Sequence, residues 1–126
     1  MRQGQLIAIV DDDASIRDTT SDLLESVGYS SMTFSSPADM LVSERLPQFA
    51  CLITDMRMPG MSGIELYERL CASGWTIPTI LVSAYPDELH RARASRVGIQ
   101  ACLRKPFTPE ALLERIAAAV DSPGPE

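Results

Sequence analysis

Short apolar runs alternate along this chain with longer segments in which apolar residues recur at helical spacing. An apolar run without polar alternation is typical of a parallel strand that is buried on both faces. Five such runs predict strands, the second of them weaker than the others: Leu6–Val10, Ser30–Phe34, Cys51–Thr54, Thr79–Val82 and Ala101–Arg104.

The segments between these runs carry helix start and stop signals. Ser36–Pro37 and Thr108–Pro109 place a capping side chain before a proline, whose missing N–H costs little in the first helical turn. Gly28 and Gly74 come just after the ends of two apolar stripes and predict helix ends there. We expect helices over Ala14–Val27, Pro37 to about Arg45, Gly63–Ala72, Pro86–Arg96 and Pro109–Val120.

Five strands alternating with five helices predict an α/β fold with a doubly wound, five-stranded parallel sheet and helices on both faces. The length of 126 residues suits one domain. We assign residues 1–120 to that domain. Residues 121–126 (DSPGPE) have the composition of a tail or of the start of a linker.

Composition narrows the function classes. The formal net charge of −6 argues against direct nucleic-acid binding, because affinity for a polyanion comes mostly from Lys and Arg. No apolar run reaches the roughly 20 residues of a membrane-spanning helix, and we expect a cytoplasmic protein that does not bind membranes. One histidine and three cysteines without a CxxC pair argue against a zinc site.

Polar residues that could take part in catalysis or metal binding fall where the predicted strands end. The first strand leads into Asp11, Asp12 and Asp13, and the third into Asp55. Ser83 follows the fourth strand and Lys105 the fifth. The carboxyl ends of parallel strands share one edge of the sheet, which is where ligands bind in such folds. The sequence therefore predicts one site at that edge.

Each of these residues alone has a structural explanation. Asp11–Asp13 could cap the following helix and favour its dipole, and Asp13, nearest the helix start, fits that role. Asp55 could be a turn former, and Lys105–Pro106 could also mark a turn. Ser83 could be a hydroxyl at a strand end whose hydrogen bonds are satisfied. Their coincidence at successive strand ends favours a functional site.

A cluster of carboxylates requires a nearby cation. Two unit charges about 4 Å apart repel by about 4 kcal/mol at an effective dielectric of about 20. Oxygen ligands in small number, with water completing the shell, suit Mg²⁺. A carboxylate beside Mg²⁺ and a lysine is equipped to attack phosphorus, because both cations neutralise charge on the phosphoryl oxygens.

Four segments carry a family resemblance: IVDDDASIR, DMRMPGMSGIEL, ILVSAYPD and LRKPF. In residues and in spacing the chain resembles response-regulator receiver domains along almost its whole length, and it is most similar to the nitrogen-fixation and nodulation type. The resemblance implies a flavodoxin-like strand order 2-1-3-4-5. It also implies a role for six residues: Asp55 as phosphoacceptor, Asp12 as direct and Asp11 as water-mediated Mg²⁺ ligand, the backbone carbonyl of Arg57 as a further metal ligand, Ser83 as switch hydroxyl and Lys105 as the conserved-type lysine.

The resemblance also implies partners. A histidine kinase or phosphotransfer protein would supply the phosphoryl group, and a C-terminal DNA-binding output domain could lie outside this chain. Relatives often form homodimers through the fourth helix, fifth strand and fifth helix. The chain departs from many relatives at Cys102, where they carry an aromatic residue. Switching by rotation of that aromatic ring is therefore not expected here.

Two other function classes compete with this signalling role. A haloacid-dehalogenase-like Mg²⁺ phosphatase also uses a strand-end aspartate, but it needs a second aspartate two residues later, where this chain has Arg57. A docking pseudo-receiver usually lacks a key residue, and none is missing here. We expect a signalling domain whose chemistry is limited to its own phosphorylation and dephosphorylation at Asp55.

Overall fold

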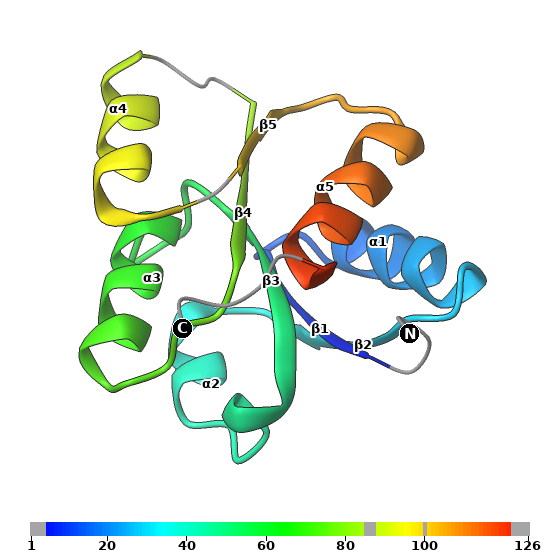
Figure 1. Cartoon of the computed structure of the whole chain (residues 1–126), viewed down its shortest axis with the longest axis horizontal. Coiled ribbons are helices and arrows are strands. Elements are labelled where there is room, and N and C mark those ends of the chain that lie inside the picture. The colour runs from blue at the N-terminus through cyan, green and yellow to red at the C-terminus, as the bar shows by residue number, and fades with distance from the viewer. Residues whose placement is uncertain (1–4, 85–87, 100, 122–126) are drawn as a thin grey trace.

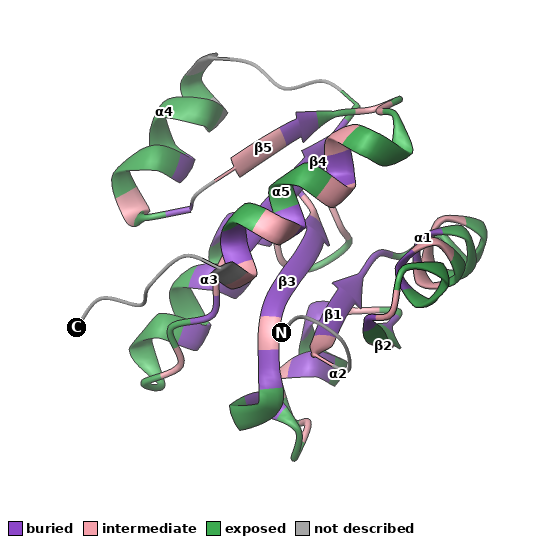
Figure 2. Ribbon diagram, turned by 45° about the vertical axis from the view of Figure 1, so that its right-hand side comes forward, coloured by how far each residue is buried: buried purple, intermediate pink, exposed green. Residues whose placement is uncertain are grey.

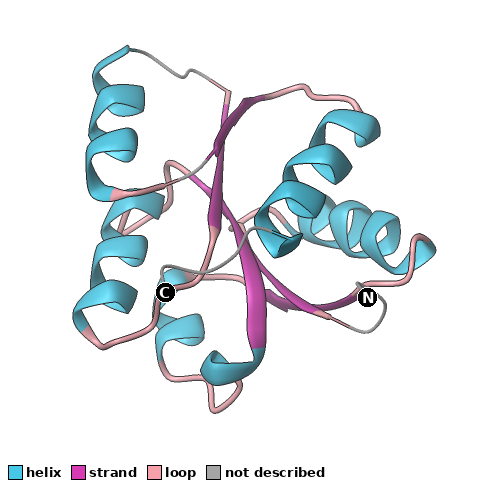
Figure 3. Cartoon of the chain, in the orientation of Figure 1, coloured by secondary structure: helices cyan, strands magenta, loops and turns pink. Residues whose placement is uncertain are grey.

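The computed structural model describes residues 5–84, 88–99 and 101–121. Strands and helices alternate along the chain, and one short 3-10 helix, η1, precedes the third strand (Figure 1, Figure 3). The elements are β1 (Leu6–Val10), α1 (Ala14–Ser26), β2 (Ser30–Phe34), α2 (Pro37–Leu41), η1 (Leu46–Gln48), β3 (Phe49–Asp55), α3 (Gly63–Ala72), β4 (Thr79–Ser83), α4 (Glu88–Val97), β5 (Ala101–Arg104) and α5 (Pro109–Asp121).

The five strands form one parallel sheet in the order β2-β1-β3-β4-β5. After β2 the chain crosses over β1 to reach β3, so β1 has β2 on one side and β3 on the other. The ladders end in register at Val10 beside Thr54 and at Asp55 beside Val82. The predicted fold class and strand order are confirmed, and the carboxyl ends of the central strands lie at one edge.

The strands β1, β3 and β4 are covered on both faces, which explains their largely unbroken apolar character. Ile7 and Ile9 of β1 point to the side covered by α1 and α5, where they pack with Leu24 and Ile116. Ala8 and the residues in register with it face α2 and α3 on the other side. Figure 2 shows the buried central strands between helices whose outer surfaces are exposed.

The second helix is shorter than its pattern predicts. It ends at Leu41 instead of near Arg45. The Ser43 N–H donates to the Met40 carbonyl at 3.0 Å, and the Ser43 hydroxyl accepts from the Arg45 N–H at 3.1 Å. A serine side chain that bonds nearby backbone competes with helix continuation, and here it closes a turn.

Other boundaries differ by a few residues. β3 begins two residues earlier than predicted, because Phe49 is buried and packs edge-to-face on Phe34 with ring centroids 5.9 Å apart. Helix α4 is described from Glu88, so the start predicted at Pro86 lies outside the described residues. Helix α5 includes Asp121, the first residue of the predicted tail, and the rest of that tail also lies outside them.

Candidate functional site

The predicted strand-end residues gather at one edge of the sheet, around the ends of β1, β3, β4 and β5. Backbone hydrogen bonds continue the sheet past its last ladder pairs. The Met56 N–H donates to the Val82 carbonyl at 2.8 Å, and the Lys105 N–H donates to the Ser83 carbonyl at 2.9 Å. The residues that follow β3 and β5 are thereby held on either side of β4.

Three carboxylates meet at this edge. Asp11, Asp12 and Asp55 each offer an oxygen atom, and these atoms all lie within 4.8 Å of one another. Asp11 is buried, Asp55 is partly buried and Asp12 is exposed. The cluster is therefore fixed in the protein on one side and open to solvent on the other.

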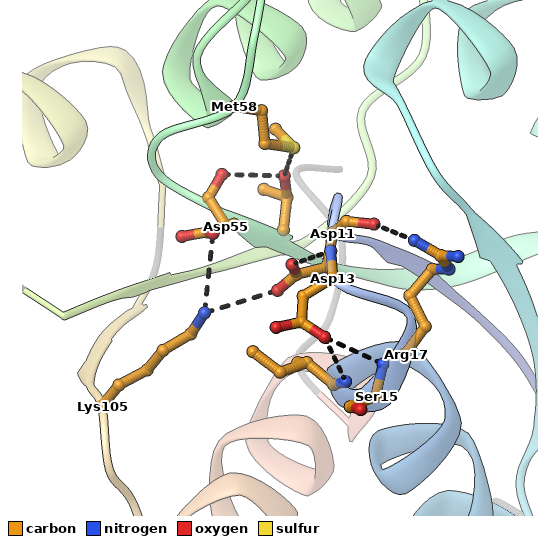
Figure 4. Close-up of polar contacts among 9 residues, drawn as sticks. Asp11, Asp13, Ser15, Arg17, Asp55, Met58 and Lys105 are labelled. Atoms are coloured by element: carbon orange, nitrogen blue, oxygen red, sulfur yellow. Dashed lines mark hydrogen bonds and ion pairs between the residues drawn. The ribbon is translucent and has the colours of Figure 1, made fainter.

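Lys105 supplies the positive charge on the protein side. Its Nζ atom lies 3.4 Å from Oδ2 of Asp11 and 3.5 Å from Oδ2 of Asp55 (Figure 4). The lysine comes from the loop after β5, and its peptide bond to Pro106 is cis. One ammonium group thus lies between two of the three carboxylates, as the sequence predicts.

Burial at the end of β3 raises the pKa of the Asp55 carboxyl above its ordinary value. The charge of Asp11 acts in the same direction, whereas Lys105 and a hydrogen bond from the Arg57 backbone N–H act against it. Burial is the largest of these causes. The metal-free site therefore holds an ionised Asp55 at a cost in free energy, and an added cation would lower that cost.

The loop after Asp55 depends on a glycine at the start of α3. A Cβ atom on Gly63 would lie 2.5 Å from the Asp55 carbonyl oxygen and 2.7 Å from a Leu81 methyl carbon. The Gly63 N–H donates to the Met56 carbonyl at 2.9 Å, which closes the loop. Only glycine permits this approach, so α3 packs directly against the strand end that carries Asp55.

The loop after β1 is ordered by its own side chains. The Asp13 carboxylate accepts from the Ser15 N–H at 2.9 Å and caps α1, as predicted. Arg17, which sequence reasoning missed, donates from Nη1 to the Asp11 backbone carbonyl at 2.7 Å. A signal was present, since a basic residue in a first helical turn opposes the helix dipole and requires another reason.

The remaining predicted site residues occupy the expected edge, with different degrees of exposure. Ser83 is buried at the end of β4, one strand away from Asp55. Arg57 is exposed two residues after Asp55, and its N–H contacts the Asp55 carboxyl group. Oxygen donors in small number, one of them solvent-exposed, match the preference of Mg²⁺ for few protein ligands and several waters.

The comparison with known families agrees with this geometry. Residues 7–117 match the family described as "Response regulator receiver domain". The chain belongs to this family, and it is a receiver domain of the two-component response-regulator type.

Two transcriptional regulatory proteins are similar to this chain in sequence. The chain is 35% identical over 114 residues to the transcriptional regulatory protein TdiR of Thauera aromatica, a match that covers 90% of this chain and 50% of TdiR. It is 34% identical over 116 residues to the transcriptional regulatory protein FixJ of Bradyrhizobium diazoefficiens, covering 90% of this chain and 56% of FixJ. The chain thus spans about half the length of these relatives.

Solved structures show the same fold. The response regulator StyR has a TM-score of 0.85 and 41% identity, with 91% of this chain and 58% of that chain covered. FixJ-N has a TM-score of 0.85 and 28% identity, with 96% and 97% covered. In the part of the chain that the structure describes, no helix has both the length and the apolar character of a membrane span.

The raised Asp55 pKa predicts a pH-dependent effect of Asp55→Asn on metal-free protein. The folded state binds the proton more tightly than the unfolded state, so stability falls as pH rises from the unfolded toward the folded pKa. Above that window the asparagine variant should be more stable than wild type, and below it the difference should shrink. Urea unfolding in chelator across acidic and neutral pH measures this.

The matched control is Asp18→Asn, which neutralises an exposed carboxylate on α1. It should bring no comparable gain at neutral pH. An Asp55→Asn variant less stable than wild type at neutral pH, or a gain that grows toward acid, would contradict the prediction.

Proposed function

We propose that Asp55 is the phosphoacceptor of this receiver domain and that a histidine kinase or phosphotransfer protein supplies the phosphoryl group. The observation that carries this proposal is the juxtaposition of the Asp55 carboxylate with Lys105 Nζ, 3.5 Å away, and with the Asp11–Asp12 pair. The group that would carry the phosphoryl lies beside both a fixed cation and further oxygen ligands.

The chain's own residues support in-line transfer. An Asp55 oxygen attacks phosphorus and forms a P–O bond, while the P–N bond to the donor histidine breaks and the imidazole leaves. Lys105 can pair with a phosphoryl oxygen, because its ammonium group already lies between Asp11 and Asp55. Ser83, at the neighbouring strand end, would donate its hydroxyl to another oxygen and couple β4 to the phosphorylated state.

Asp11, Asp12, Asp55 and the Arg57 backbone carbonyl would hold Mg²⁺, which would neutralise charge on the phosphoryl oxygens when bound. The exposed Asp12 would contact the ion directly. The buried Asp11, already bonded to Lys105 and to the Asp13 N–H, would act through water.

Incubation with acetyl phosphate and Mg²⁺ should add one phosphate to the wild-type chain, as detected by intact mass. Asp55→Asn should abolish this labelling, because an amide is a poor nucleophile. Asp13→Asn is the control: it alters a carboxylate of the same edge that caps α1, and it should still label. Labelling of the Asp55→Asn chain at the wild-type rate would refute the assignment.

Mg²⁺ should bind weakly, and calorimetric titration should rank the ligands. Loss of a direct ligand in Asp12→Ala should weaken binding by more than about tenfold, and Asp11→Ala should have a smaller effect. Affinity should also fall in acid as the carboxylates protonate. Equal and negligible effects of the two substitutions would remove the metal site from the proposal.

We also propose that phosphorylation promotes self-association through α4, β5 and α5. Leu89 on α4 is 82% exposed, and Arg91 and Arg96 of the same helix are exposed as well. Helix α5 carries the exposed Glu110 and Glu114. The remaining arginine of α4, Arg93, already pairs with Glu68 of α3 at 3.3 Å. An exposed leucine and exposed arginines on one helix, with exposed acids on another, are suited to a charge-complementary dimer.

Sedimentation with and without a beryllofluoride phosphoryl mimic tests this surface. The mimic should strengthen dimerisation of wild type, and Arg91→Glu/Arg96→Glu should raise the dimer dissociation constant by more than about tenfold. Arg45→Glu, which reverses an exposed charge between α2 and β3, should leave it unchanged. Dimerisation unaffected by the α4 reversals would place the interface elsewhere.

The length of the relatives supports one more proposal. Because the chain spans about half of TdiR and FixJ, residues 121–126 would lead into an output domain that binds DNA. The reading frame that follows residue 126 tests this directly: a frame that stops there would identify a stand-alone receiver.

The phosphatase alternative is not favoured, since Arg57 occupies the position of its second aspartate.

A further inference from the structure

Arg17 makes a contact that the proposed chemistry does not use. It lies in the first turns of α1, and its Nη1 atom donates to the Asp11 backbone carbonyl at 2.7 Å (Figure 4). The side chain is partly buried. Its target is the peptide carbonyl next to a buried metal-site carboxylate, so it contacts the loop that carries the acidic pair.

The Asp11 peptide lies just past the strand ladders. The pairing of β1 ends at Val10, beside Phe34 on one side and Thr54 on the other. The Asp11 N–H still reaches the Phe34 carbonyl at 3.2 Å. The Asp11 carbonyl accepts a hydrogen bond from the Arg17 guanidinium instead of from a neighbouring strand. A hydrogen bond from a charged donor is stronger than one from a neutral donor.

The contact closes a ring of interactions. Arg17 holds the Asp11 carbonyl, and the Asp11 carboxylate accepts from the Asp13 N–H at 2.9 Å. The Asp13 carboxylate caps α1 through the Ser15 N–H, and the Asp13 carbonyl accepts from the Arg17 N–H at 3.1 Å. Each member thus fixes the next, and the last returns to the helix turn that carries Arg17.

Asp12 lies between Asp11 and Asp13, the two aspartates whose backbones this ring of interactions holds. Its side chain is exposed, so its direction toward Asp55 depends mainly on the peptide units on either side. We propose that Arg17 is a positioning residue of the metal site: it sets the direction of the Asp11–Asp12 carboxylates without touching the ion or the phosphoryl group. This inference rests on the proposed Mg²⁺ site.

The experiment compares Arg17→Ala and Arg17→Lys with a charge control, Arg104→Ala, which removes an exposed cation next to Lys105 in sequence. Mg²⁺ affinity is measured by calorimetry at low and high KCl. The Asp13 amide proton is followed by NMR in metal-free protein, because its shift reports the hydrogen bond to the Asp11 carboxylate. Urea unfolding measures the stability of each variant.

Arg17→Ala should weaken Mg²⁺ binding about tenfold, the scale of one hydrogen bond from a charged donor, and should shift the Asp13 amide. The loss should persist at high KCl, and Arg17→Lys should recover part of it. Arg104→Ala should have a small effect that KCl screens and no effect on the Asp13 amide. If Arg17→Ala does not fold, Arg17→Gln, which keeps an N–H donor without charge, replaces it.

A native Asp13 shift with unchanged affinity in Arg17→Ala would overturn the inference. So would an affinity loss that equals that of Arg104→Ala and vanishes in salt, since it would show a charge effect alone. If wild type bound no Mg²⁺, the proposed metal site would fail, while the metal-free Asp13 shift would still decide whether Arg17 orders the loop.

Discussion

Repulsion among Asp11, Asp12 and Asp55 is the constraint on which this edge of the molecule depends. Their oxygen atoms lie within 4.8 Å of one another, and at about 4 Å each pair of charges costs about 4 kcal/mol at an effective dielectric of about 20. Lys105 offsets part of this cost by pairing with Asp11 and Asp55. Asp12 lies on the open side, where the remaining negative charge can be met by a cation from solvent.

A cluster under such repulsion keeps its shape only if the backbone holds it. The sheet does this for Asp55, because β3 is buried on both faces and Gly63 lets α3 lie directly against the strand end. In the loop after β1, the Asp11 N–H keeps one strand partner, the Phe34 carbonyl. Hydrogen bonds from the Asp13 N–H and from Arg17 hold the other polar groups of Asp11. The two halves of the site are therefore held by different means, packing on one side and polar contacts on the other.

Much of this was accessible from the sequence because the strands are buried on both faces. Unbroken apolar runs such as Leu6–Val10 identify their own bounds, and parallel strands send their ends to one edge. Asp55 and Lys105 could therefore be predicted together although 50 residues separate them in sequence numbering, 55 from 105. The early end of α2 was not accessible, because it depends on which backbone group the Ser43 hydroxyl reaches.

The role of Arg17 could not be predicted from the sequence for a related reason. Hydrophobic periodicity reports which residues face the core, but a long cationic side chain on α1 can reach solvent, a carboxylate or a carbonyl, and spacing does not distinguish these. In the structure Arg17 donates to the Asp11 backbone carbonyl, a neutral acceptor. That choice leaves the carboxylate oxygens of Asp11 to Lys105 and the Asp13 N–H. A cation that bonds the backbone orders the acidic loop without occupying the oxygens that the site requires.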